Sequence, residues 1–264
     1  MKPRVEKNQP SYISNPLKLA FEASKRFFST NKGWAILLLI LGFFSGASQF
    51  GRFEKPAPTT SSSASITQTD TTSLIAMIIF VGVFVLIFLS IMTVTAIFVQ
   101  GILTHIALES EKGKKATLPE AFNATSKRFW RLLGAQLLAF AKITGWSLLF
   151  IIPGIIAALR YTLLAYIIMD EPAEQKGIKA AHDRAKAIVK SRLLEVLGIS
   201  IVGGLPVVGG LFDLTGKAAL YRQLAVYHDK NIQKPKMHWL NIVAPILALL
   251  AALVMVLFFI LYIR

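Results

Sequence analysis

A pattern that occurs three times constrains this chain more than any other feature of its sequence. Each copy has a short basic amphipathic segment followed by two apolar runs. The first two copies open nearly alike, with LKLAFEASKRFF from Leu17 and LPEAFNATSKRFW from Leu118, and IKAAHDRAKAIV from Ile178 keeps only the pattern. Internal repeats set architecture and topology together. The sequence therefore predicts an all-α, polytopic transmembrane helical bundle of three repeated hairpins, each preceded by an amphipathic interfacial helix.

The composition places most of this chain in lipid rather than in water. Hydrophobic residues make up 54% of the sequence and charged residues 16%, with a mean hydropathy of +0.57, which is too apolar for an ordinary soluble domain. The net charge of +15 would suit nucleic acid, but 22 of the 29 Lys and Arg residues lie in four clusters beside apolar runs. Such clusters are typical of the positive-inside rule, so we expect no nucleic-acid partner.

Apolar runs long enough for a membrane predict seven spans. A helix needs about 20 residues to cross the hydrocarbon core. The predicted spans are 33–51, 71–108, 132–152, 155–169, 193–205, 207–227 and 237–263. The chain is accordingly divided into a polar tail (1–13), a six-helix domain (14–229) made of repeats 14–108, 118–171 and 176–229, and an extra C-terminal transmembrane helix (237–263). Within the first repeat, residues 52–72 are rich in Ser, Thr and Pro and predict a flexible extracytoplasmic loop.

The distribution of basic residues predicts the orientation. The tail before residue 33 has seven Lys and Arg residues, segments 112–131 and 176–192 have six each, and segment 230–236 has three. Basic loops stay in the cytoplasm. We therefore predict a multi-pass protein of the cell membrane with a cytoplasmic N-terminus and an extracytoplasmic C-terminus.

The three amphipathic segments are predicted to lie in the plane of the membrane surface. Apolar residues recur at helical spacing in each of them, with basic residues beside them. Such helices face anionic headgroups on the cytoplasmic side. The predicted headgroup contacts are Lys25, Arg26, Lys127, Arg128, Lys186 and Lys190. The alternative is that these segments pack on the bundle or simply begin the spanning helices.

Four charged residues inside the predicted spans form a candidate intramembrane polar cluster: Lys142, Arg160, Asp213 and Lys217. Arg160 and Asp213 each follow a turn proline by seven residues, so equivalent hairpins would place them at one depth, where they could meet. A charge at mid-span costs about 2.5 to 3.5 kcal/mol, which favours pairing or a wet cavity. Alternatively, Asp213 pairs with Lys217 one helical turn away, and Lys142 and Arg160 snorkel or face water.

Other motifs point to packing rather than chemistry. Gly42 and Gly46 have the spacing that lets helix backbones approach closely, so they are predicted packing positions. The chain has no cysteine, and its histidines form no metal-ligand pattern. No catalytic signature is evident either. The sequence therefore predicts no catalytic residues, no bound metal and no cofactor.

Four stretches resemble an uncharacterised bacterial multi-pass membrane superfamily that includes the membrane domain of glycerophosphoryl diester phosphodiesterases. They are LPEAFNATSKRFWRLLG from Leu118, IIPGIIAALRYTLLAYIIMDEP from Ile151, IKAAHDRAKAIVK from Ile178 and LYRQLAVYHD from Leu220. Together they span less than half of the chain. The resemblance implies a six-helix core. It implies no activity, because the phosphodiesterase chemistry belongs to a separate soluble domain that this chain lacks.

Three functional hypotheses remain after these observations. The first is a non-enzymatic membrane protein that organises lipid or a partner protein, with membrane lipids and their anionic headgroups as the expected partners. This hypothesis leaves open a protein partner or a homo-oligomer. The second is a transporter of a small anionic solute or a lipid headgroup through the polar cluster. The third is a lipid-modifying enzyme.

Overall fold

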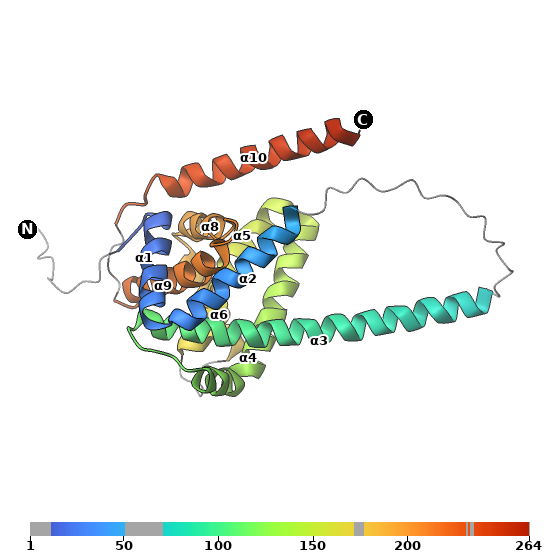
Figure 1. Cartoon of the computed structure of the whole chain (residues 1–264), viewed down its shortest axis with the longest axis horizontal. Coiled ribbons are helices and arrows are strands. Elements are labelled where there is room, and N and C mark those ends of the chain that lie inside the picture. The colour runs from blue at the N-terminus through green and yellow to red at the C-terminus, as the bar shows by residue number, and fades with distance from the viewer. Residues whose placement is uncertain (1–11, 51–70, 172–176, 231, 233–234, 264) are drawn as a thin grey trace, which may run out of the picture.

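The computed structural model describes residues 12–50, 71–171, 177–230, 232 and 235–263, and all regular secondary structure in these residues is helical. The predicted tail and the 52–72 loop fall almost wholly outside them. The helices are α1 (Pro16–Thr30), α2 (Lys32–Phe50), α3 (Thr71–Glu111), α4 (Leu118–Leu149), α5 (Ile151–Tyr161), α6 (Leu164–Asp170), α7 (Ile178–Val189), α8 (Leu193–Val202), α9 (Gly209–Asp229) and α10 (Leu240–Ile263) (Figure 1). The all-helical prediction is confirmed.

Four helical segments of the described residues are long and apolar enough to cross a membrane. They are Ile75–Glu111, Leu118–Leu149, Ile151–Asp170, which combines α5 and α6, and Leu240–Leu261. The remaining helices of the predicted hairpins differ from this pattern. α8 has 10 residues and measures about 15 Å, too little to span a bilayer alone. α9 is long enough, but it carries several charged residues.

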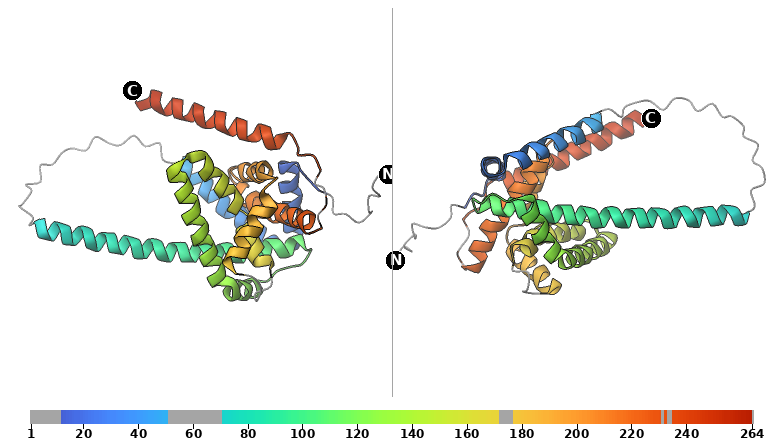
Figure 2. Two further views of the ribbon diagram at one scale, coloured as in Figure 1. Left: turned by 180° about the vertical axis from the view of Figure 1, so that it is seen from behind. Right: turned by 60° about the horizontal axis from the view of Figure 1, so that its bottom comes forward.

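The core of the bundle lies around α9. Its residues Ala218, Leu220, Tyr221 and Leu224 are fully buried, and α1, α2, α3 and α8 all pack against it. Figures 1 and 2 show the shorter helices gathered around this centre. A helix with charged residues therefore lies at the centre of the bundle, and several of its polar groups bond to other parts of the protein.

Helices α3 and α10 extend well beyond this core (Figure 2). α3 has 41 residues and a length of about 60 Å, and residues 75–96 are exposed on every side. These residues are almost all apolar, and nothing in the described part of the chain covers them. A helix that is apolar all round is stable in an apolar solvent, so this half of α3 is compatible with a membrane-spanning segment.

Local sequence signals fix where the helices begin. The side chain of Asn15 accepts hydrogen bonds from the backbone N–H groups of Leu17 and Lys18 and so caps α1. Thr117 and Glu120 form a reciprocal capping box at the start of α4. These caps explain why two of the repeated phrases begin helices at nearly the same letters.

The turn between α4 and α5 lies earlier than the sequence indicates. Pro153, the turn proline that precedes Arg160 by seven residues, lies with Gly154 in the first turn of α5. The chain reverses at Phe150, which is extended. Proline is compatible with the first turn of a helix because its missing N–H has no partner there. Gly154 has its own reason: a Cβ there would overlap the Ser147 side chain of α4.

Candidate functional site

The predicted intramembrane cluster divides into one pair and two separate cations. Lys217 Nζ lies 2.6 Å from Asp213 Oδ1, one turn apart on α9. The local alternative is thus the observed one, and no contact joins Asp213 to Arg160 among the described residues. Arg160 is exposed at the end of α5, and the Lys142 ammonium lies 5.6 Å from the centre of the Tyr161 ring. Only Asp213 and Lys217 form a candidate site together.

A cavity of about 560 Å³ contains this ion pair. Its wall is built by α3, the junction of α5 with α6, and the first half of α9. The polar lining consists of Thr95, Gln100, Thr104, Thr162, Tyr166, Asp213 and Lys217, and the apolar lining includes Met92, Val99 and Leu103. Tyr166 is already engaged, because its hydroxyl donates to the carbonyl oxygen of Leu214 at 3.0 Å. The sequence did not single out these threonines, since a lone threonine in a spanning helix is common.

The predicted headgroup residues divide into bound and exposed groups. Arg26 donates to Glu111 at 2.9 Å, and Arg128 donates to the carbonyl oxygen of Glu171 at 3.1 Å. Both guanidinium groups are therefore used inside the protein. Lys186 lies 3.8 Å from Asp183 in an exposed pair, which contributes little stability. Lys25, Lys127 and Lys190 are exposed.

Two of these lysines lie beside exposed aromatic side chains. On α1, Lys25 is within one helical turn of Phe21, which is 64% exposed, and of Phe28. On α4, Lys127 is three residues before Trp130, which is 79% exposed. Large exposed aromatics next to a free ammonium group are typical of a membrane surface. In Figure 1, α4 also changes direction along its length, so its first turns and its later turns point differently.

The prediction of a membrane-surface helix is wrong for the apolar face of α7. Ala181, Ala185 and Ile188 were expected to face the membrane, but all three are buried in the protein core. His182 on the same face contacts the carbonyl oxygen of Ala135 at 3.1 Å. The alternative that such a segment packs on the bundle therefore holds for α7, because the same periodicity serves either a protein or a lipid partner.

The ends of several helices meet in a network of ion pairs that the sequence did not predict. Lys112 at the end of α3 lies 3.1 Å from Asp170 at the end of α6, and Tyr221 of α9 donates to the same carboxylate at 3.0 Å. Arg131 of α4 pairs with Glu171, and Arg184 of α7 lies 2.9 Å from Asp229. The one sequence signal was the acidic pair that closes the 155–169 run. These contacts place the ends of α3, α6 and α9 at one charged face.

Gly42 packs within the chain. A Cβ at this position would overlap the carbonyl oxygen of Val207, which lies in the turn before α9. Val207 has φ 66°, a conformation that favours glycine, so this turn is held in an uncommon geometry. Gly42 thus lets α2 rest directly on the backbone of that turn. Gly46, the second predicted packing position, lies outside the residues whose surroundings the structure describes.

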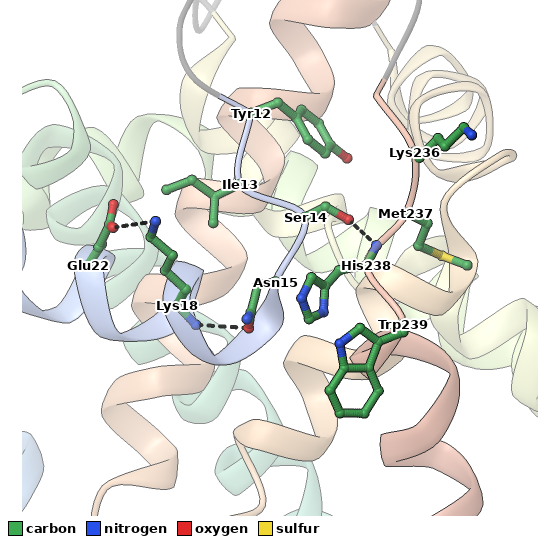
Figure 3. A pocket seen from close by; sticks show the side chains of 10 residues that line it. All are labelled: Tyr12, Ile13, Ser14, Asn15, Lys18, Glu22, Lys236, Met237, His238 and Trp239. Atoms are coloured by element: carbon green, nitrogen blue, oxygen red, sulfur yellow. Dashed lines mark hydrogen bonds and ion pairs between the residues drawn. The ribbon is translucent and has the colours of Figure 1, made fainter.

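A second cavity, of about 780 Å³, lies where the N-terminal segment meets the segment before α10 (Figure 3). Ser14 accepts from the backbone N–H of His238 at 2.6 Å, and its own hydroxyl donates to Glu195 at 3.1 Å. Figure 3 shows Lys18 directed toward Glu22, while Lys236 points away from the other side chains. Because the two ammonium groups do not converge, this cavity is a junction between segments rather than an anion site.

The described residues contain no group of three or more His, Asp or Glu side chains that could hold a metal ion. Comparison of the chain with protein-family models, with curated proteins and with solved structures finds no match.

Proposed function

We propose that this chain is a non-enzymatic integral membrane protein that anchors to anionic lipid through α1 and the first turns of α4. The observation that carries the proposal is the placement of Lys25 and Lys127, each exposed and within a turn of a large exposed aromatic side chain. The aromatic ring inserts below the headgroups, and the ammonium group contacts the headgroups themselves. Neighbouring arginines are used inside the protein, which leaves these lysines for lipid.

The topology of this proposal keeps the three repeated hairpins and the additional C-terminal helix. The charged face formed by the ends of α3, α6 and α9 is then the cytoplasmic face, as the distribution of basic residues predicts. Arg26 of α1 reaches Glu111 at the end of α3, so α1 belongs to the same face as the start of α4. α8, which is too short to span a bilayer alone, and α9 form the third hairpin of this topology.

The fluorescence of Trp130 tests this anchoring in the full-length protein. Trp34, Trp146 and Trp239 are replaced by Phe, and the protein is reconstituted with brominated phosphatidylglycerol or brominated phosphatidylcholine. We expect stronger quenching by the anionic lipid, with a preference that weakens as salt rises. Lys127→Gln should lower the preference about fivefold, because a basic residue near an anionic surface contributes about 1 kcal/mol.

The matched control for this experiment is Lys190→Gln, which removes the same charge. Lys190 follows α7, whose apolar face is buried in the protein. This variant should therefore leave the quenching of Trp130 unchanged. Equal quenching by the two brominated lipids in the parent protein would contradict the proposal.

A second candidate function is transport of a small anionic solute or a lipid headgroup, and the cavity around Asp213 and Lys217 favours it. Uptake into proteoliposomes separates the two functions. A transporter should lose uptake in Lys217→Gln while the protein stays folded. Anchoring to anionic lipid should be unaffected by that substitution, since the cavity shares no residue with the exposed faces of α1 and α4.

A further inference from the structure

We infer that the cavity between α3, α6 and α9 binds the headgroup of a phospholipid that carries a primary ammonium group, the phosphatidylethanolamine class. The first argument is the ion pair in its wall. Asp213 and Lys217 present one negative and one positive group side by side, with Lys217 Nζ 2.7 Å from Asp213 Oδ2. A headgroup with both an ammonium and a phosphate complements such a pair without adding net charge to the membrane interior.

The wall of the cavity offers hydrogen-bond acceptors for the ammonium group of this headgroup and a donor for its phosphate. The hydroxyl groups of Thr95 and Thr162 each donate to the carbonyl oxygen four residues earlier, at 2.9 Å, and retain lone pairs as acceptors. Together with Asp213 they can accept from an ammonium group. Gln100 accepts from Gln136 at 3.4 Å through its amide oxygen, so its NH₂ group remains a donor for phosphate beside Lys217.

A glycine keeps the carboxylate of Asp213 in place. A Cβ at Gly203, in the turn that follows α8, would lie 2.6 Å from Asp213 Oδ1. The end of α8 therefore closes directly over the acidic group, and only a residue without a side chain permits this approach. The Asp213 side chain therefore packs against the turn after α8 and also lines the cavity.

The apolar wall points to a lipid rather than to a soluble zwitterion. Met92 and Val99 line the cavity and are also exposed on the outer surface of α3. This surface continues into residues 75–96, which are exposed on every side and belong in lipid. An acyl chain attached to a bound headgroup can therefore lie along α3 without leaving the hydrocarbon.

The test is a competition between lipids for the full-length protein, read by native mass spectrometry after incubation with equal amounts of phosphatidylethanolamine and phosphatidylcholine. The choline group has no N–H to donate to Asp213. We expect the protein to retain phosphatidylethanolamine about tenfold over phosphatidylcholine, the effect of one hydrogen bond to a charged group. Asp213→Asn should remove the preference, whereas Lys142→Gln, outside the cavity, should not change it.

A variant with exchanged charges tests the inference if Asp213→Asn does not fold. If Asp213→Asn does not fold, the exchange of charges in Asp213→Lys with Lys217→Asp restores the internal pair and should restore the preference for phosphatidylethanolamine. Equal retention of the two lipids by the parent protein would overturn the inference, as would a folded Asp213→Asn variant with unchanged preference. Full displacement of the bound lipid by soluble phosphoethanolamine at equal concentration would overturn the assignment to a lipid.

Discussion

Single residues decide how closely the segments of this bundle approach. Gly42 allows α2 to rest on the Val207 carbonyl, and Gly203 allows the end of α8 to rest on Asp213. The neighbour of Gly42 is a backbone carbonyl, which cannot move aside. The neighbour of Gly203 is the short side chain of Asp213, which is held by Lys217. Packing of this kind depends on the absence of a side chain, so its cost on substitution follows from geometry rather than from hydrophobicity.

The substitution Gly42→Ala should lower the free energy of unfolding by about 1 to 3 kcal/mol, because the added Cβ meets a backbone carbonyl that cannot rotate away. Thermal unfolding in detergent measures the effect. Gly33→Ala in the same helix is the matched control, since a Cβ there has no neighbour within 4 Å. Equal stability of the two variants would show that α2 does not rest on the turn.

Glu195 of α8 joins the N-terminal segment to the start of α8. It is 2% exposed and accepts hydrogen bonds from Tyr12, Ser14 and Arg192. Glu195→Ala should destabilise the protein by about 3 to 5 kcal/mol, because it leaves a largely buried guanidinium without its carboxylate. Glu22→Ala removes exposed ion pairs at 3.9 and 4.0 Å and should cost less than about 1 kcal/mol. Chemical denaturation of both variants compares them, and similar losses would contradict this account.

At the scale of the element, α7 shows why an amphipathic pattern alone does not identify a membrane-surface helix. Its buried face includes His182, whose ring packs edge-on against Tyr161 with centroids 4.8 Å apart. Burial lowers the pKa of His182 below its usual value, and the charge of Lys142 lowers it further, against the opposing effect of the hydrogen bond to the Ala135 carbonyl. The folded state therefore favours the neutral ring, and its Nδ1 has no hydrogen-bond partner among the described residues.

This neutral histidine makes stability depend on pH. Since the pKa is lower in the folded state, the unfolded chain binds the proton more readily, and stability is lost as pH falls through about 6.5. The melting temperature should decrease between pH 7.5 and pH 5.5, and the decrease should be smaller in His182→Gln. A variant with the same pH dependence as the parent would exclude His182 as the cause.

The sequence predicted the elements better than their partners. The apolar runs of α3 and α10 were predicted from composition and run length. The pairing of Asp213 with Lys217 was readable as an alternative from their spacing of four residues. The burial of α7 and the contacts of Glu195 and Glu171 were not, because they join residues far apart in the chain, and no local pattern encodes which apolar face meets protein.

At the scale of the whole molecule, the proposed orientation is based on charged helix ends and on long apolar helices. Lys112 beside the end of α3 pairs with Asp170 at the end of α6, and Tyr221 of α9 donates to the same carboxylate. The segment before α10 lies beside Ser14 at the N-terminal segment. The exposed half of α3 extends away from this end (Figure 1). We therefore expect the ion-pair network at the cytoplasmic surface, with α3 crossing the membrane from it.

Labelling of single cysteines in intact cells tests this orientation most directly, because the chain has no cysteine of its own. Thr60→Cys and Lys114→Cys flank α3, and position 60 lies outside the described residues. A reagent that cannot cross the membrane should label position 60 in intact cells and position 114 only after permeabilisation. Labelling of both positions from the same side would contradict the spanning placement of α3 and, with it, the membrane architecture proposed for this protein.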